Sequence, residues 1–188
     1  MNQLHLDYLA SPEWQERLRE VVVPFAIGPT DLGDDLLELG PGPGLTTDLL
    51  RERAASITAV ELDEALATQL AARLAGTNVE VLQGDATDLP FPSGRFSGAV
   101  SFTMLHHVPT AELQDRIFVE VARVLRPGGV FVVSDSVASE ELAAAHHDDI
   151  YNPVDPGTVE ARLLAAGFAR VDVEAGGRSW RARAHTAA

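Results

Sequence analysis

The sequence contains no cysteine and no lysine, and all 14 of its basic residues are arginine. Without cysteine the chain has no disulfide bond, no thiolate metal site and no cysteine nucleophile. The 14 arginines are outnumbered by 28 acidic residues, so that the net charge is 14 − 28 = −14. Because nucleic-acid binding needs clustered basic side chains to neutralise phosphates, we expect no DNA or RNA partner.

Long apolar runs are missing as well. Charged residues, glycine or proline interrupt every helix-sized stretch before it reaches the roughly 20 residues of a membrane span. The first residues, MNQLHLDYLASPEW, contain neither a basic leader nor an apolar signal core. The sequence therefore predicts a cytoplasmic protein with no membrane partner, and it leaves a monomer and a homodimer equally open.

What the sequence does contain is the pattern of an α/β domain. It has 188 residues, of which 46% are hydrophobic and 22% are charged, as expected for one globular domain. Short apolar strands alternate with amphipathic helices over residues 36–134, which predicts a parallel sheet with helices on both faces. The last two strands, about 168–173 and 179–184, are joined by Gly176-Gly177, and this short link favours an antiparallel pair at one edge.

Two local signals predict where elements end. Ser11-Pro12-Glu13 is an N-terminal capping sequence for a helix over about 12–23, and Pro24 should end that helix because an interior proline removes a hydrogen bond. Further along, Arg126-Pro127-Gly128-Gly129 predicts a type II turn in front of a buried strand at 130–134.

Glycines and acidic residues follow the first three predicted strands. The first strand ends in Glu38 and the glycine-rich loop 40–44, the second in Glu61, and the third in Asp85-Ala86. In open parallel sheets, ligands bind beyond the carboxyl ends of the strands. Glu61 lies 21 residues after Gly40, a spacing at which an acid suits the ribose hydroxyls of a nucleoside.

The glycine-rich loop also invites comparison with the dinucleotide fingerprint G-x-G-x-x-G of nicotinamide-dependent oxidoreductases. Placed on Gly40 and Gly42, that fingerprint requires a third glycine where this chain has Leu45. Pro41 and Pro43 remove two backbone N–H donors from the loop, and a pyrophosphate cradle depends on such donors. A cationic nucleoside suits this acidic crevice better, and a nicotinamide-dependent enzyme is the less favoured alternative.

Five segments, in the correct order, resemble the class I S-adenosylmethionine-dependent methyltransferases of the type 11 small-molecule group. They are LLELGPGPG, AVELDEAL, GDATDLPFPSGRFSGAV, SFTMLHHV and EVARVLRPGGVFVVSD, which together span about residues 36–135. The resemblance implies a Rossmann-like doubly wound α/β sheet of seven strands, mostly parallel with one antiparallel strand near an edge. It also implies S-adenosylmethionine as the cofactor. Ser97 replaces the family's usual aspartate, far from the ligand edge, so we expect that difference to be structural.

The resemblance implies a role for each matching position. The 40–44 loop approaches the methionine part of the cofactor, Glu61 holds the ribose hydroxyls, and Asp85 accepts a hydrogen bond from the adenine amino group. The backbone N–H of Ala86 reaches the edge of the adenine ring, and Ser101 lines the floor of the site. The expected cofactor-binding residues are Glu38, Gly40, Pro41, Gly42, Glu61, Leu62, Asp85, Ala86 and Ser101.

The implied reaction is methyl transfer to a small-molecule acceptor by in-line displacement, in which alignment is the protein's main contribution. His106 and His107 follow the fourth strand and are the candidate catalytic residues, since a histidine can accept a proton near neutral pH. In the competing interpretation, one histidine packs and the other faces solvent. A non-catalytic protein that binds the cofactor as a sensor is a further alternative.

Residues 136–154 are expected to form part of the acceptor site, together with the loop 103–108 and with His5, Tyr8 and Trp14. Within this segment His146-His147-Asp148-Asp149 has the residue types of a metal site, but adjacent positions rarely converge on one ion. We therefore expect a solvated segment at 146–149 and no metal site in the chain.

The chain is expected to be a single methyltransferase domain, residues 1–188. Residues 1–30 form an N-terminal helical cap segment, and residues 31–135 form the cofactor-binding core. Residues 136–188 supply a loop on the substrate side, a helix and the C-terminal strand pair. Little chain is left over for a dedicated substrate domain, so we expect an acceptor site that is shallow, small or completed by a partner chain.

Overall fold

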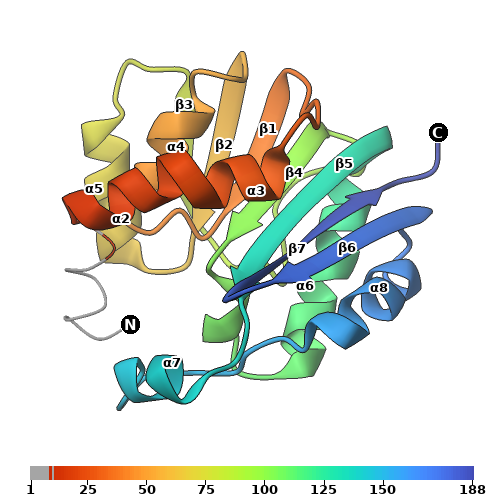
Figure 1. The fold of residues 1–188 in the computed structure, drawn as a ribbon. Coiled ribbons are helices and arrows are strands. Elements are labelled where there is room, and N and C mark those ends of the chain that lie inside the picture. The colour runs from red at the N-terminus through yellow and green to blue at the C-terminus, as the bar shows by residue number, and fades with distance from the viewer. Residues whose placement is uncertain (1–8, 10) are drawn as a thin grey trace.

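The computed structural model describes residue 9 and residues 11–188, and its helices surround one sheet of seven strands (Figure 1). The strands are β1 (Asp35–Leu39), β2 (Ser56–Glu61), β3 (Val79–Gln83), β4 (Phe96–Phe102), β5 (Leu125–Ser136), β6 (Arg170–Gly176) and β7 (Ser179–His185). Their order in the sheet is β3-β2-β1-β4-β5-β7-β6. β7 runs antiparallel to both of its neighbours, β5 and β6, and the other neighbouring pairs are parallel, which confirms the predicted doubly wound sheet and its antiparallel strand near one edge.

The helical elements lie between and around these strands. They are α2 (Pro12–Arg17), the π-helical turn η1 (Leu18–Val22), α3 (Val23–Ile27), α4 (Leu45–Leu50), α5 (Glu64–Arg73), the 3₁₀ turn η2 (Leu105–His107), α6 (Ala111–Val124), α7 (Glu140–Ala145) and α8 (Pro156–Ala165). In the described part of the chain, none of them combines the length and the hydrophobicity needed to cross a bilayer.

The sheet buries apolar side chains on both faces. Leu36 packs with α3 on one face, whereas the next residue, Leu37, packs on the other face in the core that contains α6 and α8. Successive side chains of a strand point to opposite faces, and both leucines are fully buried. A strand covered on both sides reads as a continuous apolar run, which is why β1 was visible in the sequence.

The N-terminal helix continues through Pro24, so the prediction that it ends before this residue was wrong. Between α2 and α3 the backbone N–H of Val23 bonds to the carbonyl of Leu18, five residues back, in a π turn. Pro24 then occupies the first turn of α3, where a missing N–H costs little. The wider turn absorbs the proline without breaking the helix.

The residues of the predicted type II turn, 126–129, lie inside β5, which begins earlier than the strand predicted at 130–134. Phe96 of β4 pairs with Leu125, but Gly98, two residues on, pairs with Val130, so the turn residues form a bulge inside β5. Gly128 has a φ of +75°, a conformation that glycine adopts easily and that the third residue of a type II turn requires.

A substitution at Gly98 tests how tightly β4 is packed. A Cβ added at this position would lie 2.4 Å from the carbonyl oxygen of Leu32. That oxygen belongs to the backbone and cannot rotate away. We expect Gly98→Ala to lower the free energy of unfolding by about 1–3 kcal/mol, measured by urea denaturation. Gly176→Ala is the control, since its Cβ would meet nothing within 4 Å and its effect should stay within about 0.5 kcal/mol. Equal losses in the two variants would contradict this account of Gly98.

Candidate cofactor and acceptor site

A cavity of about 450 Å³ opens at the carboxyl ends of β1, β2, β3 and β4. This volume lies within the roughly 300–1,000 Å³ of small-molecule sites. All but one of the residues predicted to bind the cofactor line it, namely Glu38, Gly40, Pro41, Gly42, Glu61, Leu62, Asp85 and Ala86. The structure thus brings together three loops that are far apart in the sequence.

Ser101 is the predicted residue that does not line this cavity. Its side chain is 1% exposed inside β4, and the next residues, Phe102, Thr103 and Met104, reach the cavity instead. Thr103 has a φ of +52°, which is uncommon for a residue other than glycine. The chain therefore turns sharply where it leaves β4, and this turn shapes the floor of the cavity.

The glycine-rich loop is held close to the sheet. The N–H of Gly40 donates to the carbonyl of Val60 at 2.9 Å, and a Cβ at Gly40 would lie 2.3 Å from the Cγ of Met104. Its φ of +63° also favours glycine. The N–H of Gly42 donates to Oε2 of Glu61 at 2.9 Å. Gly40 therefore allows a close approach between the loop and Met104, whereas Gly42 has open space around it and a φ of +54° that favours glycine.

Glu61 has a carboxylate that is fixed in position by backbone amides. Its Oε2 accepts from Gly42, and its Oε1 accepts from the N–H of Asp63 at 3.1 Å. The side chain is largely buried at the end of β2 and lines the cavity. A carboxylate accepts more than two hydrogen bonds, so Glu61 can also bind hydroxyl groups of a ligand.

Glu38 is a buried carboxyl group at the cavity wall. Its pKa is raised from 4.5 to about 7, mainly because the carboxyl group is buried. The Thr47 hydroxyl lowers this pKa, and the negative charges of Asp48 and Glu61 raise it further. Its Oε2 has no hydrogen-bond partner in the part of the chain that the structure describes. A cation bound in the cavity would supply the missing partner, so the residues present fit a cationic nucleoside.

Asp85, Ala86 and Leu62 form the outer part of the cavity wall. Asp85 is exposed, and its Oδ1 accepts from the N–H of Thr87 at 2.8 Å, which closes a turn. Leu62 exposes 66% of its surface, an unusual amount for a leucine beside a cavity. These residues offer one carboxylate and an apolar face, as the predicted adenine position requires, and their roles stay predictions.

A second cavity of about 350 Å³ adjoins the first, since Leu9, Trp14 and Thr103 line both. The predicted acceptor segments meet here: the loop after β4 supplies Thr103 and His106, and the segment 136–154 supplies Ser136, Leu142 and His146. Trp14 takes part as expected, whereas His5 and Tyr8 lie outside the described residues.

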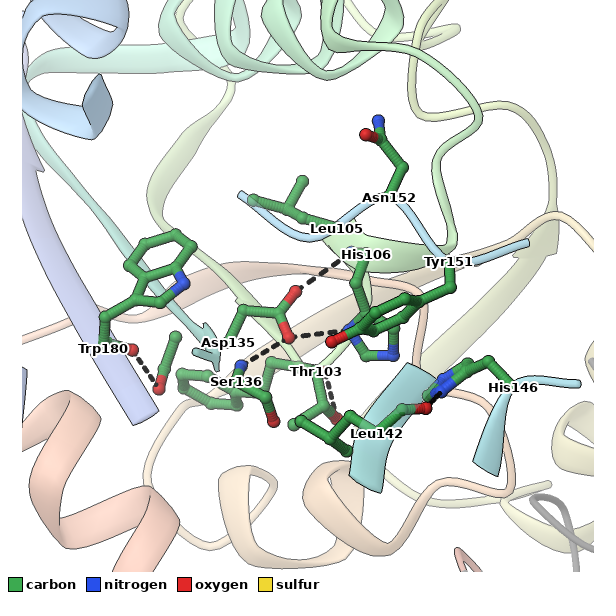
Figure 2. A network of polar contacts seen from close by, with 12 residues as sticks. Thr103, Leu105, His106, Asp135, Ser136, Leu142, His146, Tyr151, Asn152 and Trp180 are labelled. Atoms are coloured by element: carbon green, nitrogen blue, oxygen red, sulfur yellow. Dashed lines mark hydrogen bonds and ion pairs between the residues drawn. The ribbon is translucent and has the colours of Figure 1, made fainter. Parts of the chain in front are cut away.

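The two candidate catalytic histidines face different cavities. His107 lines the larger one, and His106, which is 4% exposed, lines the smaller one. Asp135, at the end of β5, binds His106 twice: Oδ1 contacts Nδ1 at 2.7 Å, and Oδ2 accepts from the backbone N–H at 3.1 Å (Figure 2). We did not predict Asp135, although it is an acid at a strand end, like Glu61 and Asp85.

His146 contradicts the prediction that residues 146–149 are solvated. Its side chain is 3% exposed and its Nδ1 contacts the carbonyl oxygen of Leu142 at 2.6 Å. The ring stacks on that of Tyr151, with 4.8 Å between the centroids. The N–H of Asn152 donates to the carbonyl of His106 at 2.7 Å, so the segment folds back onto the loop after β4. That long-range contact has no signature in the local sequence.

Ser97 has the structural role expected for it. Its hydroxyl oxygen accepts from the N–H of Asp35 at 2.9 Å and lies within hydrogen-bond distance of the Leu32 carbonyl, at 3.1 Å. These bonds tie the start of β4 to the chain that enters β1, at the end of the sheet opposite the cavities.

Comparisons with known proteins agree with this geometry. A family model described as a methyltransferase domain matches residues 37–133, just over half of the chain. A probable S-adenosylmethionine-dependent methyltransferase of Mycolicibacterium smegmatis is 35% identical over 102 residues, 54% of this chain and 38% of the relative. An O-methyltransferase of Penicillium expansum is 29% identical over 90% of this chain and 66% of its own length.

Among solved structures, an S-adenosylmethionine-dependent methyltransferase from Archaeoglobus fulgidus matches with a TM-score of 0.76. It is 16% identical, and the match covers 98% of this chain and 100% of that chain, so it shows a shared fold. The chain spans about two fifths of the length of the first curated relatives that it matches.

The buried carboxyl of Glu38 makes stability depend on pH. Its folded pKa of about 7 exceeds the ordinary 4.5, so in this window the folded protein holds a proton that the unfolded chain releases. Stability is therefore full below pH 4.5 and falls as the pH rises to about 7, by about 3 kcal/mol from this group. Glu38→Gln imitates the protonated form, and we expect urea denaturation to show that it removes this fall.

The control for that measurement is Glu80→Gln, because Glu80 is exposed on β3. This variant should follow the wild-type pH profile. If the profile of Glu38→Gln also runs parallel to that of the wild type, Glu38 does not carry the raised pKa.

Proposed function

The chain belongs to the class I S-adenosylmethionine-dependent methyltransferases of the type 11 group, and from that premise we propose that it methylates a small-molecule acceptor. The cofactor occupies the larger cavity and the acceptor the smaller one. The observation that carries this proposal is that the two cavities share part of their walls, at Leu9, Trp14 and Thr103. Transfer needs such a junction because reacting atoms must approach to about 3–3.5 Å.

The acidic wall of the larger cavity supports a cationic cofactor. When bound, S-adenosylmethionine supplies an electrophilic methyl group on a positively charged sulfur. In this proposal Glu61 holds the ribose hydroxyls and Asp85 receives the adenine amino group. Glu38 contributes negative charge toward the cationic end, and Leu62 covers one face of the adenine.

The smaller cavity supports a small acceptor. Its volume of about 350 Å³ admits a compact molecule, and its wall mixes apolar residues such as Trp14 and Leu142 with Ser136 and the histidines. Relatives of this chain are named as a fatty-acid O-methyltransferase and a demethylmenaquinone methyltransferase. Others are named ribosomal RNA methyltransferases but match only 31–32% of this chain, and a net charge of −14 disfavours such a partner.

We assign activation of the acceptor to His106 and His107. An oxygen or nitrogen acceptor loses a proton when it is methylated, and an imidazole beside it can take that proton. Asp135 is a positioning residue, since its carboxylate holds both the ring and the backbone of His106. The cytoplasmic location and the monomeric or homodimeric state stay predictions.

Isothermal titration calorimetry with S-adenosylmethionine and with its demethylated product tests the cofactor site. We expect both to bind, and we expect Glu61→Ala and Asp85→Ala each to weaken binding at least tenfold, because each removes a hydrogen bond to a charged group. Asp88→Ala is the matched control, since Asp88 is exposed nearby and does not line the cavity. No binding of either ligand to the folded wild-type protein would overturn the proposed function.

Release of demethylated cofactor, measured with a panel of small hydroxyl, amine and carboxylate acceptors, tests catalysis. With an acceptor that turns over, His107→Asn should lower kcat by about 10²–10⁴. His147→Asn is the control, because His147 is the adjacent histidine of the second pair and its side chain is 87% exposed. Tight cofactor binding without turnover on any acceptor would instead support the sensor interpretation.

A further inference from the structure

Three histidine side chains from two distant segments meet beside the two cavities. His106 and His107 belong to η2 after β4, and His146 directly follows α7. One ring nitrogen from each lies within 4.8 Å of those from the other two. Nitrogens so placed lie at most about 2.8 Å from a common centre, so ring movements of under about 1 Å reach the roughly 2.0–2.1 Å of a zinc–nitrogen bond.

The groups behind two of the rings orient them as metal ligands. The Nδ1 of His146 contacts the carbonyl oxygen of Leu142, which only accepts, so this Nδ1 carries the proton and Nε2 carries the lone pair. The carboxylate of Asp135 acts in the same way on Nδ1 of His106 (Figure 2). Backbone carbonyls and carboxylates are the partners that hold metal-binding histidines in this orientation.

The histidine cluster is largely buried and lies beside a buried carboxylate. His106 and His146 are almost fully buried, and their rings meet edge to face, with 4.9 Å between the centroids. Asp135, 1% exposed, places a negative charge behind the cluster. Arg17 and Arg178 also line the smaller cavity, but Arg178 is paired with Glu141. A cation held by the three rings would thus lie next to a buried carboxylate.

We propose that His106, His107 and His146 bind one divalent transition-metal ion of the zinc and cobalt type. Imidazole nitrogens suit these ions, and three protein ligands leave a fourth position open, as in catalytic zinc sites. His107 lines the larger cavity, whereas His106 and His146 line the smaller one, so the ion lies at their boundary. The proposal departs from the expectation that the chain has no metal site, which was drawn from residues 146–149 alone.

The role of the ion rests on the proposed function, although its binding does not. An acceptor hydroxyl or amine at the open position would be polarised by the ion and would release its proton to solvent. The histidines would then activate the acceptor by holding the ion, and not by accepting the proton themselves. Chelation distinguishes the two routes, because removal of the ion abolishes activation by the ion but leaves proton transfer to a histidine possible.

The experiment uses the full chain without an affinity tag, freed of metal by chelation and dialysis and then titrated with cobalt chloride. We expect one equivalent of Co²⁺ to bind, with the visible absorption of a tetrahedral ion, and zinc chloride to displace it. His146→Ala should weaken Co²⁺ binding by at least tenfold, and Asp135→Asn by about 10–100-fold. His147→Ala should leave Co²⁺ affinity unchanged, since this exposed neighbour lies outside the cluster.

Folding of each variant is checked by far-ultraviolet circular dichroism, and His146→Gln serves as the milder substitution if His146→Ala does not fold. No saturable Co²⁺ binding by the folded wild-type protein, or an equal loss in His147→Ala, would overturn the inference. Calorimetry with demethylated cofactor runs in parallel. Cofactor binding without Co²⁺ binding would overturn the metal site alone. Co²⁺ binding without cofactor binding would overturn the proposed function and would still support the metal site.

Discussion

The parallel direction of β1 to β5 is the constraint on which both cavities depend. Parallel strands end on the same side of the sheet, so the loops that follow them gather at one edge. The order of the strands reverses at β1, with β2 on one side of it and β4 on the other. The glycine-rich loop and the turn at Thr103 therefore lie next to each other, although more than 60 residues of chain separate Gly40 from Thr103. The crevice between them is where a doubly wound sheet binds its ligand.

Charge is what distinguishes this crevice from a phosphate site on the same fold. Burial is the largest penalty on the ionisation of Glu38, and the negative charges of Asp48 and Glu61 add to it. Such an arrangement is costly for the protein alone and becomes favourable when a cation enters, because the cation offsets both the burial and the repulsion. The larger cavity is thus prepared for positive charge.

The strands and the acids at their ends were predictable because they are local signals. An apolar run covered on both faces, a glycine where φ is positive and an acid directly after a strand are all read within a few residues. The error at Pro24 occurred where the local rule has a less common alternative. A proline breaks the interior of an α-helix, but Pro24 fits in the first turn of α3 after a π turn.

The sequence by itself determined the parallel sheet, the antiparallel pair at its edge and the three loops that meet in the larger cavity. It also determined the acidic character of that cavity, since Glu38, Glu61 and Asp85 lie at or just after the ends of strands whose direction is set by the alternation of elements. Only the tertiary structure decided which histidines come into contact. His146 is 40 residues from His106 and joins it because the segment after β5 folds back over the loop after β4. No periodicity encodes that contact, since it arises from two irregular segments packing together.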